Sequence, residues 1–115
     1  MITLTLPWPP SVNHYYRHVG PRTLISRAGR TYRKRVVRSV YGMQPMFGPL
    51  AVEIDAHPPD RRRRDTDNLL KGVLDALQHA GLYGDDSQIE DLHIRRRGVV
   101  PEGRLVVRIM EASAA

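Results

Sequence analysis

Residues 60–91 read D-R-R-R-R-D-T-D-N-L-L-K-G-V-L-D-A-L-Q-H-A-G-L-Y-G-D-D-S-Q-I-E-D, and this stretch carries the strongest structural pattern in the chain. Apolar residues recur in it at helical spacing, which predicts an amphipathic helix from about Asp67 to Ala80. Gly81 follows at the position where a residue with left-handed backbone commonly ends a helix. Asp65 or Asp67 is expected to cap the start of the helix. The apolar stripe consists of Leu69, Leu70, Val73, Leu74 and Leu77.

Short segments on both sides of this helix alternate apolar and polar residues, which is the pattern of half-buried β-strands. Several are followed by prolines, which end strands because a proline cannot donate to the ladder. The segment between residues 7 and 18 is expected to be a loop. Strands are expected over residues 2–6, 50–56, 89–99 and 104–110, and a short one over 23–25.

A first helix is expected over residues 28–43, with Ser26 as its N-cap. The resulting order of strands and helices predicts a single α+β domain over residues 1–115. In this domain a mixed β-sheet of about four strands is packed by two helices. The apolar face of the first helix would consist of Tyr32, Val36, Val37, Val40 and Tyr41.

The composition favours a polyanionic partner, because the formal net charge of the 115 residues is +6. Nucleic acid is expected ahead of a membrane surface. The absence of cysteine excludes a disulfide framework and a zinc–thiolate site. The sequence has no signal-peptide pattern and no long apolar span, so an intracellular protein without a membrane partner is expected. Such a short chain buries a modest core, which makes oligomerisation plausible.

Acidic residues gather in the most arginine-rich part of this basic chain, since eight of the twelve lie within residues 60–91. Asp65 and Asp67 could hold a hard divalent cation such as Mg²⁺, which prefers oxygen ligands. The run Arg61–Arg64 could hold a phosphodiester backbone beside that cation. Together these residues predict a metal-dependent phosphodiester-cleaving site. The alternatives are that the acids only cap the helix and that the arginines form a solvated loop.

Two further residues could complete this site. Asp86, in the Gly-bounded Asp85–Asp86 loop, would be a third carboxylate, although aspartates are also common in turns. Lys71 follows Asp67 by one helical turn, and it is one of only two lysines beside sixteen arginines. A compact ammonium near a phosphate would explain that choice, and an ordinary helix pair is the alternative. Asp75 is expected on the surface.

The loop after the helix has little slack if Asp86 is to reach the other two acids. A helix of about fourteen residues is roughly 21 Å long, whereas five extended residues span at most about 17 Å. Residues 81–86 are therefore expected to run back along the helix nearly extended, with Leu82 or Tyr83 packed as an anchor. The alternative is that Asp86 serves a site completed by a second subunit.

Two other regions could bind nucleic acid. The aromatic and basic segment 8–18 offers Asn13, Tyr16 and Arg17 for stacking and phosphate contacts, unless its aromatic rings fold back onto the core. The first helix is expected to present Arg33 and Lys34 on a basic surface.

Several of these motifs resemble the RusA-type Holliday-junction resolvases, small endodeoxyribonucleases of bacteria and their prophages. The resemblance rests on P-W-P-P-S, Y-Y-R-H and R-R-R-R-D-T-D-N-L-L-K followed by D-D, and it covers about residues 4–111. It implies a RusA-like fold and a cytoplasmic homodimer that cuts four-way DNA junctions symmetrically with Mg²⁺ or Mn²⁺. The family's catalytic carboxylates fall on Asp65, Asp67 and Asp86, and its essential lysine falls on Lys71.

The chain departs from the family pattern at Val12-Asn13, where many members have two asparagines, and over residues 39–50, which match poorly. Two other functions are compatible with the residues themselves. One is a non-catalytic nucleic-acid-binding module whose acids only cap a helix. The other is a metal-dependent ribonuclease on the same scaffold.

Overall fold

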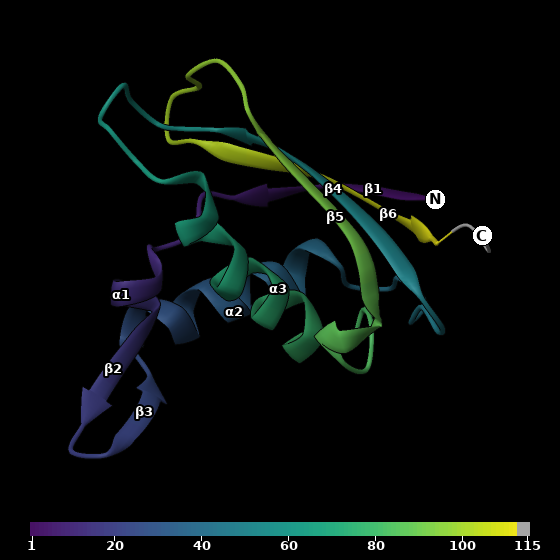
Figure 1. Cartoon of the computed structure of the whole chain (residues 1–115), viewed down its shortest axis with the longest axis horizontal. Helices are drawn as coiled ribbons and strands as arrows, with labels where there is room; N and C mark the ends of the chain where they lie inside the picture. The colour runs from purple at the N-terminus through teal and green to yellow at the C-terminus, as the bar shows by residue number, and fades with distance from the viewer. Residues whose placement is uncertain (113–115) are drawn as a thin grey trace.

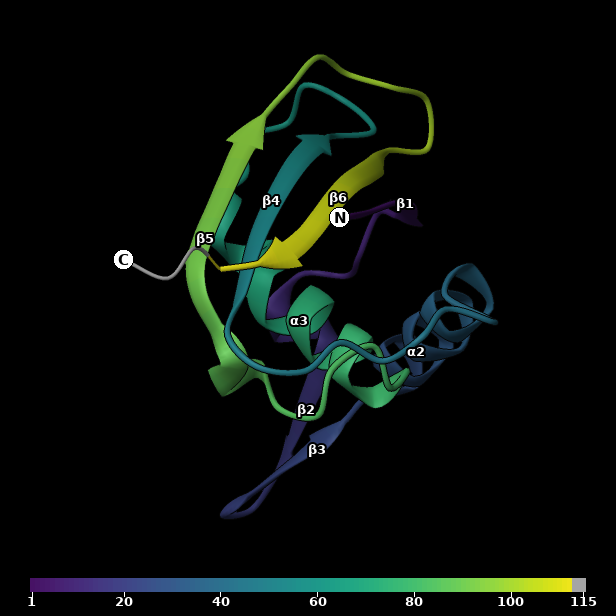
Figure 2. The same cartoon turned by 90° about the vertical axis from the view of Figure 1, so that its right-hand side faces the viewer.

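A computed structural model describes residues 1–112 and places a four-stranded mixed sheet over a layer of helices (Figures 1 and 2). The strand order is β1-β6-β4-β5, in which β4 and β5 are parallel and the other neighbours are antiparallel. The predicted α+β class is confirmed. The strands are β1 (Ile2–Pro7), β4 (Leu50–His57), β5 (Ile89–Arg96) and β6 (Arg104–Glu111).

The core lies between the helices and one face of the sheet. Alternating residues of β6 point into it, so Leu105, Val107 and Ile109 are fully buried. Each lies opposite a buried residue of β4, as in the pair Ile54 and Val107. The period of two predicted from the sequence therefore sets the register of the central strands.

Helix α2 (Arg27–Ser39) begins as predicted, because the Ser26 hydroxyl accepts a hydrogen bond from the Gly29 N–H at 3.0 Å. It ends four residues before the predicted end at residue 43. Tyr41 therefore lies outside the helix and is 89% exposed, and Val37 is also exposed, so neither belongs to the core face. Gly42, with a φ of 83°, turns the chain away from the helix axis.

The segment predicted as a loop before α2 contains regular structure. It forms a short helix α1 (Val12–Tyr15) and the strand β2 (Tyr16–Val19). Strand β2 pairs with β3 (Arg22–Ile25) in a hairpin that projects from the body of the molecule (Figure 1). The predicted short strand at 23–25 is confirmed, and its partner was missed because the hairpin is held by only four residue pairs.

Strand β5 ends at Arg96, three residues before the predicted end. Its parallel partner β4 ends at His57 and is followed by two prolines, so no ladder continues beyond this point. The chain instead makes single contacts, in which the Arg97 N–H donates to Ala56 O and the Val100 N–H donates to Pro58 O. Within residues 1–112, no helix is both long and apolar enough to cross a membrane.

Asp55 is a buried carboxylate on the sheet face opposite the helices. It accepts hydrogen bonds at 3.1 Å from Arg97 and from Arg108, and Arg95 lies 3.9 Å away. Burial alone would raise the pKa of the Asp55 carboxyl, but the bonds from Arg108 and Arg97 outweigh it and hold that pKa below its usual value. This cluster fixes the residues that follow β5 against the sheet.

Candidate active site

The loop between β4 and α3 (Leu70–His79) is folded by its own charges. We call residues 58–66 the arginine loop. Asp60 accepts hydrogen bonds from the Arg62 N–H at 2.9 Å and from Arg64 Nη1 at 2.7 Å. The bonds from Arg64 and from the Arg62 backbone hold the pKa of the Asp60 carboxyl well below its usual value. The Arg64 guanidinium also lies 5.8 Å from the centre of the Trp8 ring.

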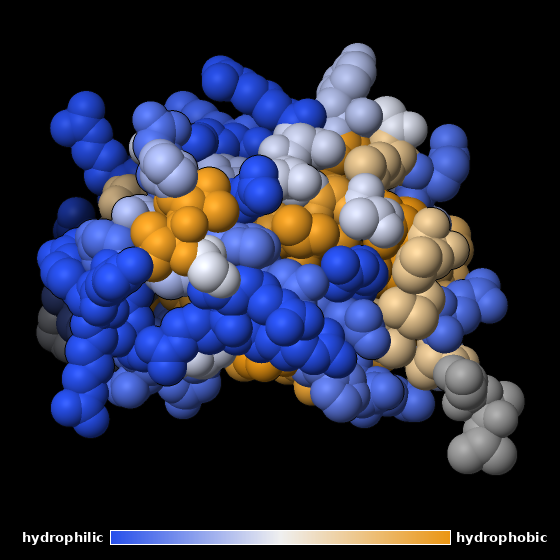
Figure 3. Space-filling view, turned by 90° about the horizontal axis from the view of Figure 1, so that it is seen from above, coloured by the Kyte–Doolittle hydropathy of each residue, from blue (hydrophilic) through white to orange (hydrophobic). Residues whose placement is uncertain are grey.

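The remaining side chains of the arginine run are exposed to solvent. Arg61, Arg62 and Arg63 are exposed, whereas the Arg64 side chain is only 22% exposed. Seen from above, hydrophilic residues cover most of the left-hand side of the surface, and apolar patches lie in the centre and on the right (Figure 3). The solvated-loop alternative therefore holds for Arg61 and Arg63. Arg62 and Arg64 both pair with Asp60, and the half-buried Arg64 is a structural member of the loop.

The start of the predicted second helix is a 3-10 turn, η1 (Thr66–Leu69), followed by α3. Asp65 occupies the N-cap position, but its side chain accepts no capping hydrogen bond. Within residues 1–112, neither the Asp65 nor the Asp67 carboxylate accepts a hydrogen bond from the protein, and both residues are exposed. The predicted N-cap position of Asp65 is therefore confirmed, but its side chain forms no capping bond, and both carboxylates remain available for another ligand.

The two acidic residues in the turn after α3, Asp85 and Asp86, have different roles. Asp85 caps a second 3-10 turn, η2 (Asp86–Gln88), by accepting from the Ser87 N–H at 3.0 Å. This bond lowers the pKa of the Asp85 carboxyl. Asp86 is exposed and its carboxyl has a raised pKa, first through partial desolvation, next through a hydrogen bond with the Asp85 carboxyl, and then through the Asp85 and Asp75 charges. Asp85 thus caps the turn, and Asp86 is the carboxylate of the pair that caps no turn.

The predicted anchor of the 81–86 loop is confirmed, because Leu82 and Tyr83 are both buried. The Tyr83 hydroxyl donates to Leu74 O at 2.6 Å, and Met46 N–H donates to Leu82 O at 2.8 Å. The Asp86 N–H, however, donates to the Gln78 side chain at 2.9 Å. The loop therefore returns only to the C-terminal half of α3.

The three predicted metal ligands do not meet in one chain. Gln78 lies eleven residues after Asp67, which corresponds to roughly 16 Å along a helix axis. Within the described residues, no three His, Asp or Glu side chains are grouped so that they could hold a metal ion. The oxygen donors of Asp65, Asp67 and Asp86 suit Mg²⁺ chemically, but their arrangement in a single chain does not fit one ion.

Lys71 lies over an aromatic ring. Its Nζ is 4.9 Å from the centre of the Tyr16 ring, and in residues 1–112 it makes no ion pair with Asp67. The pKa of the Tyr16 hydroxyl is raised by burial first, and the nearby Asp75 and Asp86 charges raise it further. The helix-pair alternative for Lys71 is therefore wrong, and the lysine and Asp86 share the neighbourhood of Tyr16.

Asp75 and Arg33 were both predicted to lie on the surface, and both predictions are wrong. Asp75 and Arg33 are half-buried and joined by two hydrogen bonds of 3.0 and 2.8 Å to Asp75 Oδ2. The Tyr15 hydroxyl donates to the same oxygen at 2.6 Å. This cluster was not predicted from the sequence. The only local signal was that Asp75 follows Lys71 by four residues, which places it on the same helix face as a residue of the predicted site.

A family model and individual relatives both place this chain in the same protein family. The model of the family described as Endodeoxyribonuclease RusA matches residues 7–110. A protein of Enterobacteria phage 82, named crossover junction endodeoxyribonuclease rusA, is 47% identical over 111 residues, which cover 94% of this chain and 92% of the relative. Relatives of the same name from Shigella sonnei (strain Ss046) and Escherichia coli (strain K12) are 46% and 45% identical over 112 residues, covering 95% of this chain and 93% of each relative. The chain therefore belongs to the RusA endodeoxyribonuclease family.

Proposed function

We propose that this protein is a structure-selective endodeoxyribonuclease that resolves four-way DNA junctions by paired, symmetric nicks. The observation that carries the proposal is the pair of exposed, unbonded carboxylates Asp65 and Asp67 directly after the arginine loop. The relatives are named crossover junction endodeoxyribonucleases and come from bacteria and a phage, which supports action on DNA in the bacterial cytoplasm.

A divalent ion is part of the proposal, with Mg²⁺ ahead of Mn²⁺ and with Asp65, Asp67 and Asp86 as its ligands. When bound, such an ion would activate a water molecule and stabilise the departing oxygen. Because one chain does not bring the three carboxylates together, we assign their assembly to a second subunit or to movement of the 81–86 loop when DNA binds. A homodimer also suits symmetric cutting, because a two-fold axis relates two sites.

Lys71 is proposed as the cation that contacts the phosphate. Its ammonium is exposed and lies over the Tyr16 ring, which restricts where the charge can point. The Tyr15–Arg33–Asp75 cluster lies beneath the same neighbourhood and fastens α1, α2 and α3 to one another. Tyr16 and the cluster therefore position Lys71 within this proposal.

The proposed DNA contacts come from two regions. Exposed arginines Arg61, Arg62 and Arg63 would hold the backbone near the carboxylates. Asn13 and Arg17 on α1 and β2, with Lys34 on α2, would extend this surface. Arg64, Arg33 and Tyr16 are held by protein partners, so their proposed part is to support these neighbours.

One gel tests the proposed function. Labelled four-way junction, duplex arms of the same sequence and a stem-loop RNA are incubated with the protein, with and without Mg²⁺. Nicking confined to the junction and dependent on Mg²⁺ is the expected result. Binding of the junction without any cutting would favour the non-catalytic module, and cutting of the RNA alone would favour the ribonuclease.

A further inference from the structure

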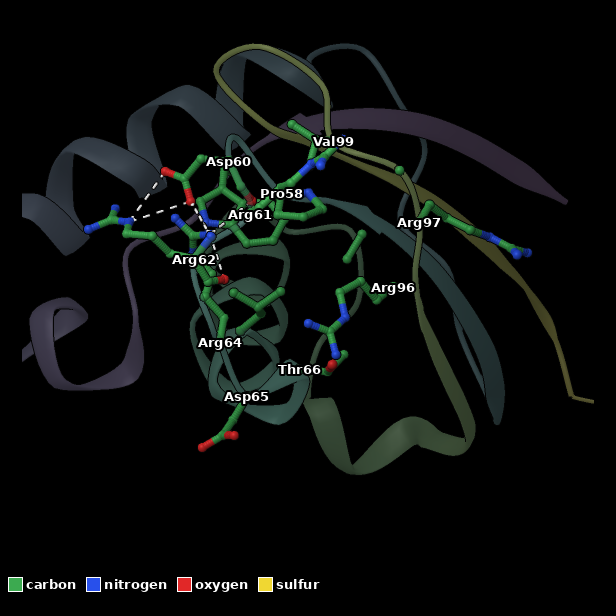
Figure 4. Close-up of a pocket in the computed structure, with 14 residues that line it drawn as sticks. Pro58, Asp60, Arg61, Arg62, Arg64, Asp65, Thr66, Arg96, Arg97 and Val99 are labelled. Carbon is green, nitrogen blue, oxygen red and sulfur yellow. Dashed lines mark hydrogen bonds and ion pairs between the residues drawn. The ribbon is translucent and has the colours of Figure 1, made fainter.

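A pocket opens between the arginine loop and the residues that follow β5 (Figure 4). Its volume is about 460 Å³, within the range of ~300–1,000 Å³ that is usual for sites of small ligands. One wall is the arginine loop, and the opposite wall is formed by residues 96–99. The lining also includes Trp8, whose ring centre lies 5.8 Å from the Arg64 guanidinium. Neither residues 96–99 nor Trp8 belongs to the DNA contacts proposed above.

The pocket combines an apolar lining with cationic residues. Pro58, Leu69 and Val99 line it together with the Trp8 ring, and a flat apolar surface suits the face of a nucleobase. Arg61 and Arg96 also line it, from opposite walls. A nucleotide complements such a lining, because its planar base can pack on the apolar surface and its negatively charged phosphate can bind the arginines.

The arginines of the pocket divide into fixed and free groups. Arg64 is held by Asp60, and Arg97 is held by Asp55, so each wall has one arginine fixed by an ion pair. Arg61 and Arg96 are exposed, and within residues 1–112 their side chains make no ion pair or hydrogen bond. Their guanidinium groups are therefore available for phosphate oxygens, which arginine binds in a bidentate manner.

We propose that this pocket receives one unstacked nucleotide of the DNA, with its base against Trp8 and Val99 and its flanking phosphates on Arg61 and Arg96. The proposal rests on the proposed function and deepens it. A base that is paired and stacked in a duplex cannot enter a concave pocket, whereas a nucleotide at a strand-exchange point can leave the stack at lower cost. The pocket would thus recognise the branch point of the junction rather than the arms.

The position of Asp65 connects the pocket to the proposed cutting site. Asp65 lines the same pocket, and its carboxylate points away from the arginines (Figure 4). A strand whose base is seated in the pocket would therefore leave past this carboxylate. The occupied pocket would set which phosphodiester lies beside Asp65.

Trp8 makes the pocket directly observable, because it is the only tryptophan of the chain. Its fluorescence is followed during titration in EDTA with a four-way junction, with one duplex arm, and with the same junction carrying abasic sites at the crossover. Val99→Phe fills the pocket without a change of charge, and Val37→Phe is its control at an exposed valine of α2. Arg96→Gln tests the phosphate contact, and Arg38→Gln is its control on α2.

We expect the intact junction to quench Trp8, and the duplex arm and the abasic junction to have little effect. Val99→Phe should remove the quenching and weaken junction binding about tenfold, as expected for one lost stacked base. Arg96→Gln should weaken binding more than Arg38→Gln does. Equal quenching by the abasic junction would mean that phosphate alone is bound, and this result would overturn the proposal, as would unchanged quenching in Val99→Phe.

The test separates this inference from the proposed function. Nicking of the junction by the unmodified protein with Mg²⁺ is measured in parallel. Normal nicking without a junction-specific response of Trp8 would refute the pocket alone. A junction-specific response without any nicking would support the pocket and refute the nuclease.

Discussion

Replacing Gly72 by alanine sets two effects of known size against each other. In a helix interior, alanine is more favourable than glycine by about 1 kcal/mol. Gly72 lies inside α3, but a Cβ added there would be 2.9 Å from Tyr15 Cδ2 and 3.3 Å from Tyr15 Cε2. Overpacking of this kind typically costs ~1–3 kcal/mol.

The outcome depends on whether the Tyr15 ring can move. The ring is fully buried, and its hydroxyl is bonded to Asp75 at 2.6 Å. The ring also packs against those of Tyr16 and Tyr32, whose centroids are 4.7 and 6.5 Å from its own. Because the hydrogen bond and these two rings restrict the Tyr15 ring, we place the clash in the upper half of its range and expect a net loss of about 1–2 kcal/mol.

Urea unfolding followed by circular dichroism measures this loss at a fixed protein concentration, so that any oligomer contributes equally. The control is the same substitution in a Tyr15→Ala background, where the Cγ, Cδ2 and Cε2 atoms that approach Gly72 are absent. There Gly72→Ala should be neutral or stabilising by up to about 1 kcal/mol. A stabilised Gly72→Ala in the native background would refute the argument that the Tyr15 ring is restricted.

Three further outcomes are expected. Asp67→Asn should lower junction nicking by roughly 100-fold or more and leave junction affinity equal or tighter, since a negative charge facing phosphates is removed; nicking at the normal rate in a gel assay would contradict this. Lys71→Arg should lose most of the nicking, because a planar guanidinium does not replace a compact ammonium over the Tyr16 ring; near-normal cutting would remove Lys71 from the site. The free energy of unfolding should fall as the pH drops below about 4, because the folded-state pKa of Asp55 is lowered and its contribution is lost as the pH falls through that value; urea titrations of Asp55→Asn should show a weaker dependence on pH in this range, and an unchanged dependence would exclude Asp55 as its source.

The fold could be predicted from the sequence where one period dominates. Strands β4 and β6 carry an apolar residue at every second position, and each buries the predicted residues on one face. The stripe of α3 likewise buries Leu69, Val73 and Leu77 as expected, although Leu70 and Leu74 remain partly exposed. Boundaries were less accurate, because they depend on where a partner strand ends or where a glycine turns the chain.

Contacts between residues far apart in the sequence could not be predicted from local sequence patterns. Nothing near Arg33 in sequence reveals that its partner is Asp75, forty-two positions later, or that Tyr15 joins them. The residues proposed to act chemically could be selected, because acids beside an arginine run are unusual. Their assembly could not, because the position of Asp86 depends on the Gln78 side chain and on the buried anchor of the loop.

The most direct measurement uses a supercoiled plasmid that extrudes a single cruciform, which is a four-way junction. A first unpaired nick releases the supercoiling and reabsorbs the junction, leaving an open circle, whereas two coordinated nicks across the junction give a linear molecule. With Mg²⁺ the account predicts linear product cut at the cruciform base, and none with Asp67→Asn. Open circles alone, or cuts away from the cruciform, would contradict a junction-resolving enzyme with paired sites.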